Sequence, residues 1–267
     1  MMIYLAILMI LAFFLKFHES FEETKDYGFK SKREISIFGC MATIPSRTKH
    51  LDKVIDSLKK QVDHLFIYCN YGKNDKLPLY LDQDWITVGL GWKTGDYNDS
   101  SKFYFVPNLK GYIFTVDDDI IYHKNYVSDM INKLKKYNNK VVVTYHGGIL
   151  PKNVTNYTKE RNLIHLNGLN NEDKFVNICG TGVTAFHSDL LPCLSLNVFK
   201  TGYRSDLWFS LFLQKNNIPI VCIKHDKLLF EQIKYKYNLW SSEINFEKFK
   251  TKNTEIANQI EWKVFGV

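Results

Sequence analysis

The sequence predicts an α/β domain with a mostly parallel, mixed sheet flanked by helices, preceded by an N-terminal apolar segment. The chain has 267 residues, of which 45% are hydrophobic and 24% are charged, as in an ordinary globular protein. From residue 35 onward, short apolar runs alternate with segments of helical periodicity, which is typical of a parallel sheet. No linker or internal repeat divides this part. We therefore expect residues 35–267 to form a single domain.

The first residues form a separate element. Residues 1–15 are an uninterrupted apolar run that ends at Lys16. At about 15 residues, the run is shorter than the roughly 20 that usually span a bilayer. It lacks the basic start and the small-residue cleavage site of a signal peptide. We interpret residues 1–17 as an uncleaved single-pass membrane anchor, with a cleaved signal segment as the alternative, and residues 18–34 as a polar linker. The mixed charges after the anchor do not fix its orientation.

Strands and helices are expected in alternation along the domain. Apolar residues recur at i, i+3, i+4 and i+7 within residues 51–58 and 127–134, which predicts helices there, and residues 207–213 are also expected to be helical. The polar segment 147–174 is expected to be a long surface loop. Runs rich in β-branched and aromatic residues predict strands at residues 35–41, 64–69, 111–116, 141–145, 183–186 and 218–223.

Charge and cysteine usage exclude several classes of protein. The formal net charge of +7 is spread along the chain, so we expect no nucleic-acid partner. The five cysteines are an odd number without C-x-x-C spacing, which disfavours both a disulfide framework and a zinc site. We interpret all five as buried free thiols, namely Cys40, Cys69, Cys179, Cys193 and Cys222.

Several motifs of nucleotide-binding and hydrolytic enzymes are absent from the sequence. It has no G-x-G-x-x-G after the first predicted strand and no G-x-x-x-x-G-K-[ST], which disfavours dinucleotide dehydrogenases and P-loop NTPases. It also lacks the G-x-S-x-G and H-E-x-x-H motifs.

An acidic triplet, Asp117, Asp118 and Asp119, follows the predicted strand 111–116. Three adjacent carboxylates repel one another, so they need a compensating cation or exposure to water. At the carboxyl end of a parallel strand they would face the crevice where α/β sheets bind ligands. Their hard oxygen ligands suit Mg²⁺ or Mn²⁺. The alternative is an acidic turn that caps the next helix.

Three further segments point to the same crevice. Residues 43–47 lead from the first strand into a helix, whose free N–H groups favour an anion, with Arg47 alongside. Residues 95–102 form a polar loop that brings a cation, Lys102, near the triplet. Asp206 begins an apolar helix, where it is either a catalytic acid or a helix N-cap. An ordinary helix cap explains the first segment equally well, and a solvated turn explains the second.

These residues resemble the GT-A nucleotide-sugar glycosyltransferases, especially small family-2-like members from bacteria and large DNA viruses. The resemblance covers residues 35–226 and implies a Rossmann-like GT-A domain. It lies in Ala42-Thr-Ile-Pro-Ser-Arg47, Ile67-Tyr-Cys-Asn70, Gly95-Asp96 with Lys102-Phe103, the acidic triplet, Gly180-Thr-Gly182 and Asp206-Leu-Trp-Phe209.

The resemblance implies a role for each motif. Donor-binding residues would be Thr43, Pro45, Arg47, Asn70, Gly95, Asp96, Lys102, Asp117 and Asp118. A Mn²⁺ or Mg²⁺ ion would be held by Asp117 and Asp119, with His225 completing its ligands. The wall around the sugar or acceptor would comprise His146, Gly147, Gly148, Gly180, Thr181, Gly182 and Trp208, with Tyr203 as a further stacking face.

The expected reaction is transfer of a sugar from a nucleotide-diphosphate donor to a hydroxyl of a glycan, lipid or protein. Asp206 would be the general base of an inverting displacement. A Ser precedes this single Asp, whereas family-2 members often carry an acidic pair there, which leaves the base and the inversion open. The alternatives are a metal-dependent phosphohydrolase or nucleotidyltransferase, and a non-catalytic, membrane-tethered carbohydrate-binding protein.

Overall fold

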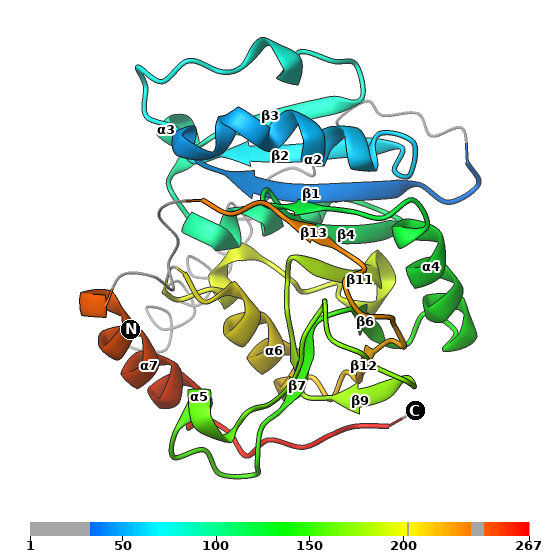
Figure 1. The fold of residues 1–267 in the computed structure, drawn as a ribbon, viewed down its shortest axis with the longest axis vertical. Helices are drawn as coiled ribbons and strands as arrows, with labels where there is room; N and C mark the ends of the chain where they lie inside the picture. Colours follow the sequence, from blue (N-terminus) through cyan, green and yellow to red (C-terminus); the bar gives the residue numbers. More distant parts are fainter. Residues whose placement is uncertain (1–32, 202, 236–242, 267) are drawn as a thin grey trace, which may run out of the picture. The chain divides into compact units, whose positions relative to one another are not determined.

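The computed structural model describes residues 33–201, 203–235 and 243–266. In this part of the chain eight strands form one sheet in the order β3-β2-β1-β4-β11-β6-β12-β9. Figure 1 shows this order running from β3 at the top of the view to β9 near the bottom. The strands are β3 (Ile86–Leu90), β2 (His64–Cys69), β1 (Ile37–Thr43), β4 (Tyr112–Asp117), β11 (Val183–His187), β6 (Val142–Thr144), β12 (Ile220–Cys222) and β9 (Lys174–Val176).

The sheet is mixed and mostly parallel, as predicted. The first four strands in the order above pair in parallel, and β12 is parallel to β6. The strands β11 and β9 run against their neighbours. Strand β1 has β2 on one side and β4 on the other, so the strand order reverses between β1 and β4. Ligands of open α/β sheets bind outside the carboxyl ends of the strands at such a reversal.

Helices cover one face of the sheet. Every second residue of a strand points toward this face. In β4, Tyr112, Phe114 and Val116 pack in one hydrophobic core with buried residues of α2 (Leu51–Leu58) and α4 (Tyr126–Lys136). The apolar spacing that predicted these two helices is therefore the spacing of their buried faces.

The opposite face packs against α6 (Ser205–Lys215) and the 3₁₀ helix η3 (Asn98–Phe103). The ring of Phe209 on α6 lies 5.8 Å from Phe186 of β11 and 5.0 Å from Phe103 of η3, between ring centroids. Because Thr115 and Asp117 alternate with the residues of the first core, they face this side of the sheet. Asp117 therefore emerges between η3 and α6.

Several smaller elements lie outside the eight-stranded sheet. The predicted loop 147–174 instead contains β7 (Gly147–Ile149), α5 (Tyr157–Glu160) and β8 (Asn162–Ile164), and β7 pairs with β8 and with β10 (Ile178–Cys179). The pair β5 (Ile120–Ile121) and β13 (Glu231–Gln232) forms a second small ladder. The other helices are α3 (Gly91–Thr94), α7 (Glu243–Ala257) and the 3₁₀ helices η1 (Pro45–His50), η2 (Leu79–Leu81), η4 (Val106–Asn108), η5 (Ser188–Leu190) and η6 (Leu196–Val198).

The cysteines and the N-terminal segment differ in how far the described residues bear on them. Four cysteines are buried free thiols, but Cys193 is exposed, because it lies in an irregular segment between η5 and η6. The predicted anchor, residues 1–17, and most of the predicted linker lie outside the described residues. Within the described ranges, no helix combines the length and the apolar character needed to cross a bilayer.

Candidate functional site

The candidate site lies at the carboxyl edge of β1 and β4. Ala42 pairs with Asp117 across the two parallel strands. The segment that follows β1 and the acidic triplet that begins with the last residue of β4 therefore leave the sheet side by side. This edge coincides with the reversal of strand order, where a ligand site is expected.

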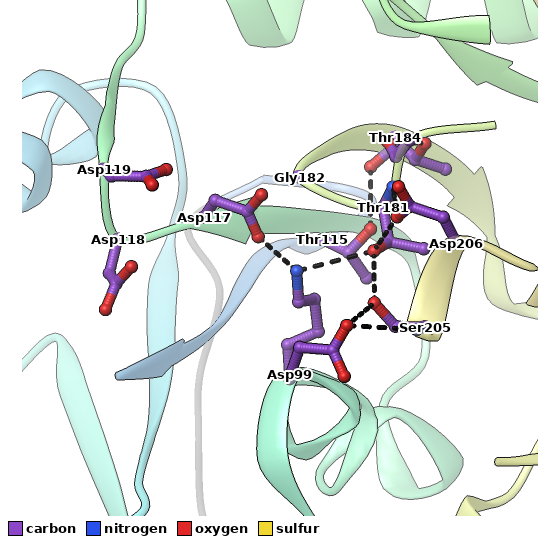
Figure 2. Close-up of polar contacts among 12 residues, drawn as sticks. Asp99, Thr115, Asp117, Asp118, Asp119, Thr181, Gly182, Thr184, Ser205 and Asp206 are labelled. Carbon is purple, nitrogen blue, oxygen red and sulfur yellow. Dashed lines mark hydrogen bonds and ion pairs between the residues drawn. The ribbon is translucent and has the colours of Figure 1, made fainter. Parts of the chain in front are cut away.

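The three acids of the triplet face different surroundings. Figure 2 shows the side chain of Asp118 pointing away from those of Asp117 and Asp119. The guanidinium of Arg47 donates to Asp118 Oδ1 at 2.5 Å and to Asp119 Oδ2 at 3.2 Å. Burial raises the pKa of Asp118, and the Arg47 charge opposes this shift. Burial and the charge of Asp117 raise the pKa of Asp119 to about 7.

Lys102 supplies a buried cation on the other side of Asp117. Its side chain, on η3, is only 4% exposed, and its ammonium group forms an ion pair with Asp117. Burial alone lowers the pKa of Lys102, but the charges of Asp117 and Asp99 outweigh burial and raise it overall. The ammonium group also donates to Thr181 Oγ1 at 3.5 Å. Lys102 thus carries a positive charge inside the site.

Asp206 lies beyond Thr181 on the same side of the sheet. Its Oδ1 accepts hydrogen bonds from Thr181 N and Thr181 Oγ1, both at 2.7 Å (Figure 2). The N-cap of α6 is Arg204, so the interpretation of Asp206 as a helix cap is wrong. Burial raises the pKa of Asp206, and the bonds from Thr181 and the charge of Lys102 reduce this effect.

Sequence reasoning missed two members of this cluster. Asp99 Oδ2 accepts hydrogen bonds from Ser205 N at 3.0 Å and from Ser205 Oγ at 2.8 Å. Asp99 therefore satisfies the first N–H of α6 from η3, 106 positions earlier in the chain. No spacing rule joins residues so far apart, although both occur in segments that the sequence singled out.

Asp117 and Asp119 are the candidate ligands for a divalent cation. Their side chains are 37% and 31% exposed, so water and a ligand can reach them. Gly182 brings its backbone against the carboxylate of Asp117, which a Cβ at this position would overlap. Among the described residues, no cluster of three or more His, Cys, Asp or Glu side chains is arranged around a metal position. A Mg²⁺-type site that uses one or two carboxylates, waters and substrate phosphates needs no such cluster.

His225 does not join this pair. Its Nδ1 lies 2.8 Å from Ile223 O and its Nε2 lies 3.1 Å from His165 O. Because both ring nitrogens face backbone carbonyls, neither presents a free lone pair to a cation in this arrangement. The predicted ligand role of His225 gains no support and stays a prediction.

The remaining donor-side residues lie around the same edge. Asn70, at the end of β2, donates to Asn98 O at 2.8 Å and accepts from Ser101 Oγ at 2.7 Å, so it holds η3 in place. Thr43 is buried at the end of β1, and Pro45 begins η1 in an exposed position. Gly95 adopts φ +115°, and Asp96 accepts a local bond from Asn98 N. No described contact joins Gly95 or Asp96 to the acidic triplet.

The predicted wall divides into two groups. Gly180 packs against the ring of His146, and Thr181 and Gly182 lie beside Asp206 and Asp117. Gly147 and Gly148, by contrast, belong to the buried strand β7, where a Cβ would press on neighbouring strands. Burial, with the nearby charges of His165 and Arg161, lowers the pKa of His146 to about 3, so its ring is neutral.

Trp208 is buried and does not offer the sugar-stacking face that the resemblance implied. The residue is 4% exposed and packs in a second hydrophobic core with α7 and Trp262. Its indole N–H donates to Thr201 Oγ1 at 2.9 Å. On a helix without a polar stripe, a large aromatic residue is buried. Tyr203, at 47% exposure, keeps an accessible ring.

Comparison with known proteins adds no assignment, since neither a protein-family model nor a curated protein sequence gives a significant match to the chain. The chemistry of the site is therefore inferred from its own residues.

Proposed function

We propose that the protein is a metal-dependent glycosyltransferase of the GT-A type, which moves a sugar from a nucleotide-diphosphate donor to an acceptor hydroxyl. One observation carries the proposal: side-chain contacts lead from Asp117 through Lys102 and Thr181 to Asp206. They join Asp117, one of the two partly exposed carboxylates suited to a cation, with a third acid suited to proton transfer. The two chemistries that the reaction needs thus meet at one sheet edge.

The donor half of the site consists of Asp117, Asp119 and the cations beside them. A Mn²⁺ or Mg²⁺ ion bound by Asp117 and Asp119 would neutralise charge on the donor's diphosphate. Arg47 and Lys102 fix the orientation of these carboxylates before the donor arrives, so little reorganisation is needed. Because Lys102 is buried and paired, its role in this proposal is to position Asp117 rather than to contact the diphosphate.

The acceptor half depends on Asp206. Its Oδ1 is held by Thr181, while Oδ2 takes no hydrogen bond among the described residues. In the proposed reaction the acceptor's O–H bond breaks as its oxygen attacks the sugar, and the proton moves to Asp206. Burial favours the protonated form of Asp206, which makes this carboxylate a stronger base than one in water.

Thermal unfolding with a panel of nucleoside diphosphates, each with and without manganese, tests the donor half. We expect stabilisation by at least one nucleoside diphosphate, only with manganese, and its loss in Asp119→Ala. Incubation with the corresponding nucleotide sugars and a mixture of glycan acceptors then tests transfer. Release of inorganic phosphate would instead favour a phosphohydrolase, and transfer of the nucleotidyl group a nucleotidyltransferase. Binding of sugars without nucleotides would favour a carbohydrate-binding protein.

Asp206→Asn tests the base. Asn keeps an oxygen that can accept both bonds from Thr181, so at a pH where Asp206 is ionised the melting temperature and donor affinity should stay nearly constant. Turnover should fall by roughly 10²–10⁴-fold, because the amide cannot take a proton. Asp189→Asn is the matched control, since Asp189 follows β11 at the opposite edge of the sheet. Turnover of Asp206→Asn within a few-fold of wild type would remove Asp206 from the reaction.

A further inference from the structure

Two hydroxyl side chains, Thr181 and Ser205, connect the carboxylates of Asp206 and Asp99 into one chain of contacts in the acceptor half of the site. Asp206 Oδ1 lies 2.7 Å from Thr181 Oγ1, which lies 2.9 Å from Ser205 Oγ, which lies 2.8 Å from Asp99 Oδ2. Figure 2 shows these contacts as a continuous line from Asp206 to Asp99. Thr181 and Ser205 are 1% and 2% exposed, so bulk water does not complete their bonding.

Counting hydrogens shows that the chain is one proton short when both carboxylates are ionised. It then has three oxygen–oxygen contacts but only two hydroxyl protons, one on Thr181 and one on Ser205. Ser205 must donate to Asp99, because an ionised carboxylate cannot donate. Thr181 can donate either to Asp206 or to Ser205, so one close contact is left without a hydrogen.

One additional proton removes this deficit. If Asp206 donates to Thr181, Thr181 donates to Ser205 and Ser205 donates to Asp99, then every contact holds one hydrogen. Lys102 already donates to Thr181 Oγ1, which leaves this hydroxyl free to donate onward. A buried network that is fully satisfied is more stable than one with a missing donor.

We propose that Asp99 and Asp206 share one proton through Thr181 and Ser205, which makes Asp99 a positioning residue that sets the proton affinity of Asp206. The consequence for catalysis rests on the proposed function, whereas the sharing of the proton does not. In catalysis, the proton that leaves the acceptor hydroxyl forms a new O–H bond on Asp206, and the shared chain stabilises this protonated state.

The surroundings of the two acids agree with this inference. One oxygen of Asp99, Oδ1, is buried and has no hydrogen-bond partner among the described residues, so Ser205 is the contact through which its charge is stabilised. Burial raises the pKa of Asp206, which favours uptake of a proton there. The other titratable groups that act on Asp206 are Lys102, Asp117, Tyr157 and Cys179, and those that act on Asp99 are Lys102, Tyr203 and Arg204.

Thermal unfolding across pH tests proton sharing without any assay of activity. Ser205→Ala breaks the chain but keeps the backbone N–H that bonds to Asp99. Sharing raises the proton affinity of the folded state, so its stabilisation is present at low pH and lost as pH rises. The melting temperature of wild type minus that of Ser205→Ala should therefore fall by about 3 °C between roughly pH 5 and pH 8.

The control is Ser210→Ala, which removes another buried hydroxyl from α6; this hydroxyl bonds to Cys179 N and to the backbone oxygen of Asp206, not to the side-chain oxygens of the chain. Its difference from wild type should not vary with pH. If the difference for Ser205→Ala is equally constant, the proton is not shared and the proposal is overturned.

The pH dependence of kcat/KM then tests the catalytic consequence. Asp99→Asn keeps an acceptor for Ser205 but removes the charge, so the acid limb should move to lower pH by roughly one unit with KM for the donor unchanged. Ser205→Ala should shift the limb in the same direction. If both variants remain active and the acid limb of their kcat/KM profiles stays at the wild-type pH, the proposal is overturned and the proposed function is left intact. If no donor supports transfer, the proposed function fails, and the melting comparison still decides whether the proton is shared.

Discussion

At the scale of single residues, burial and nearby cations give identical side chains different chemistry. Asp118 is nearly buried and pairs with Arg47, whereas Asp117 and Asp119 keep a third of their side-chain surface exposed. Adjacent carboxylates therefore divide into a structural ion pair and two groups that a ligand can reach.

Asp119 predicts how metal binding depends on pH. Its pKa of about 7 lies above the ordinary value for aspartate, so the stability that it contributes to the metal-free protein is present at low pH and is lost as pH rises through about 7. A divalent cation binds the ionised carboxylate and reverses this loss. Manganese should therefore raise the melting temperature more at roughly pH 8 than at roughly pH 5.5.

Asp119→Asn provides the comparison, because it keeps an acceptor for Arg47 without the charge. This variant should lose both the decline in stability with pH and the stabilisation by manganese. A manganese effect of equal size at both pH values would contradict the role of Asp119 as a titrating ligand.

The residues of the site could be predicted only in part from the sequence. The sequence could identify Asp117, Lys102 and Asp206 as candidates, because each lies in a segment whose polarity interrupts an apolar pattern. Asp99 and Ser205 could not be paired, since their contact depends on how η3 packs on α6, which no local pattern encodes. The accessibility of the Trp208 ring was predicted wrongly for a related reason, because the sequence alone does not say which neighbours cover an aromatic ring.

At the scale of elements, the 3₁₀ helix η3 positions the ammonium group of Lys102 beside Asp117 of the triplet. It is a short 3₁₀ helix without a side-chain cap, so it depends on contacts with its neighbours. Asn70 provides two of these, through Asn98 O and Ser101 Oγ. The end of β2 thereby fixes the segment that carries Lys102.

Asn70→Ala should loosen η3 and weaken donor binding. Loss of two hydrogen bonds should lower the free energy of unfolding by about 1–3 kcal/mol. Affinity for the nucleotide with manganese should also fall, by roughly tenfold if one charge-assisted bond is misplaced, as measured by calorimetry. Asn177→Ala is the matched control, because Asn177 also makes two bonds, both to the backbone of Leu150, away from the triplet. Equal loss of affinity in both variants would show that the effect is only one of stability.

The elements themselves were predictable where hydrophobic periodicity is strong. Predicted and observed limits agree for β2 and for α2, whose apolar residues are completely covered. Strand β3 was not predicted, although Ile86, Val88 and Leu90 alternate along it. Strand β7 was not predicted because two of its three residues are glycines without a hydrophobic signal, and its pairing with β8 and β10 makes it a strand.

At the scale of the whole molecule, the division between anchor and domain can be tested by truncation. Arg33 donates to Asp63 Oδ1 at 2.8 Å, and Ile37 N donates to Asp63 Oδ2 at 2.9 Å, so the start of the described domain is bound to the connection between α2 and β2. Every described residue of the proposed site lies after this point. A chain that begins at Arg33 should therefore retain the complete site.

We expect this shortened chain to melt cooperatively, within a few degrees of the full chain, and to bind nucleotide and manganese with the same affinity. The physical reason is that the hydrophobic cores on both faces of the sheet form entirely from residues after Arg33 in the described structure. Sedimentation with liposomes should separate the two proteins, since only the full chain carries the apolar residues 1–15. A broad, uncooperative melt of the shortened chain would contradict the domain boundary, whereas its continued sedimentation with liposomes would contradict the assignment of residues 1–17 as the anchor.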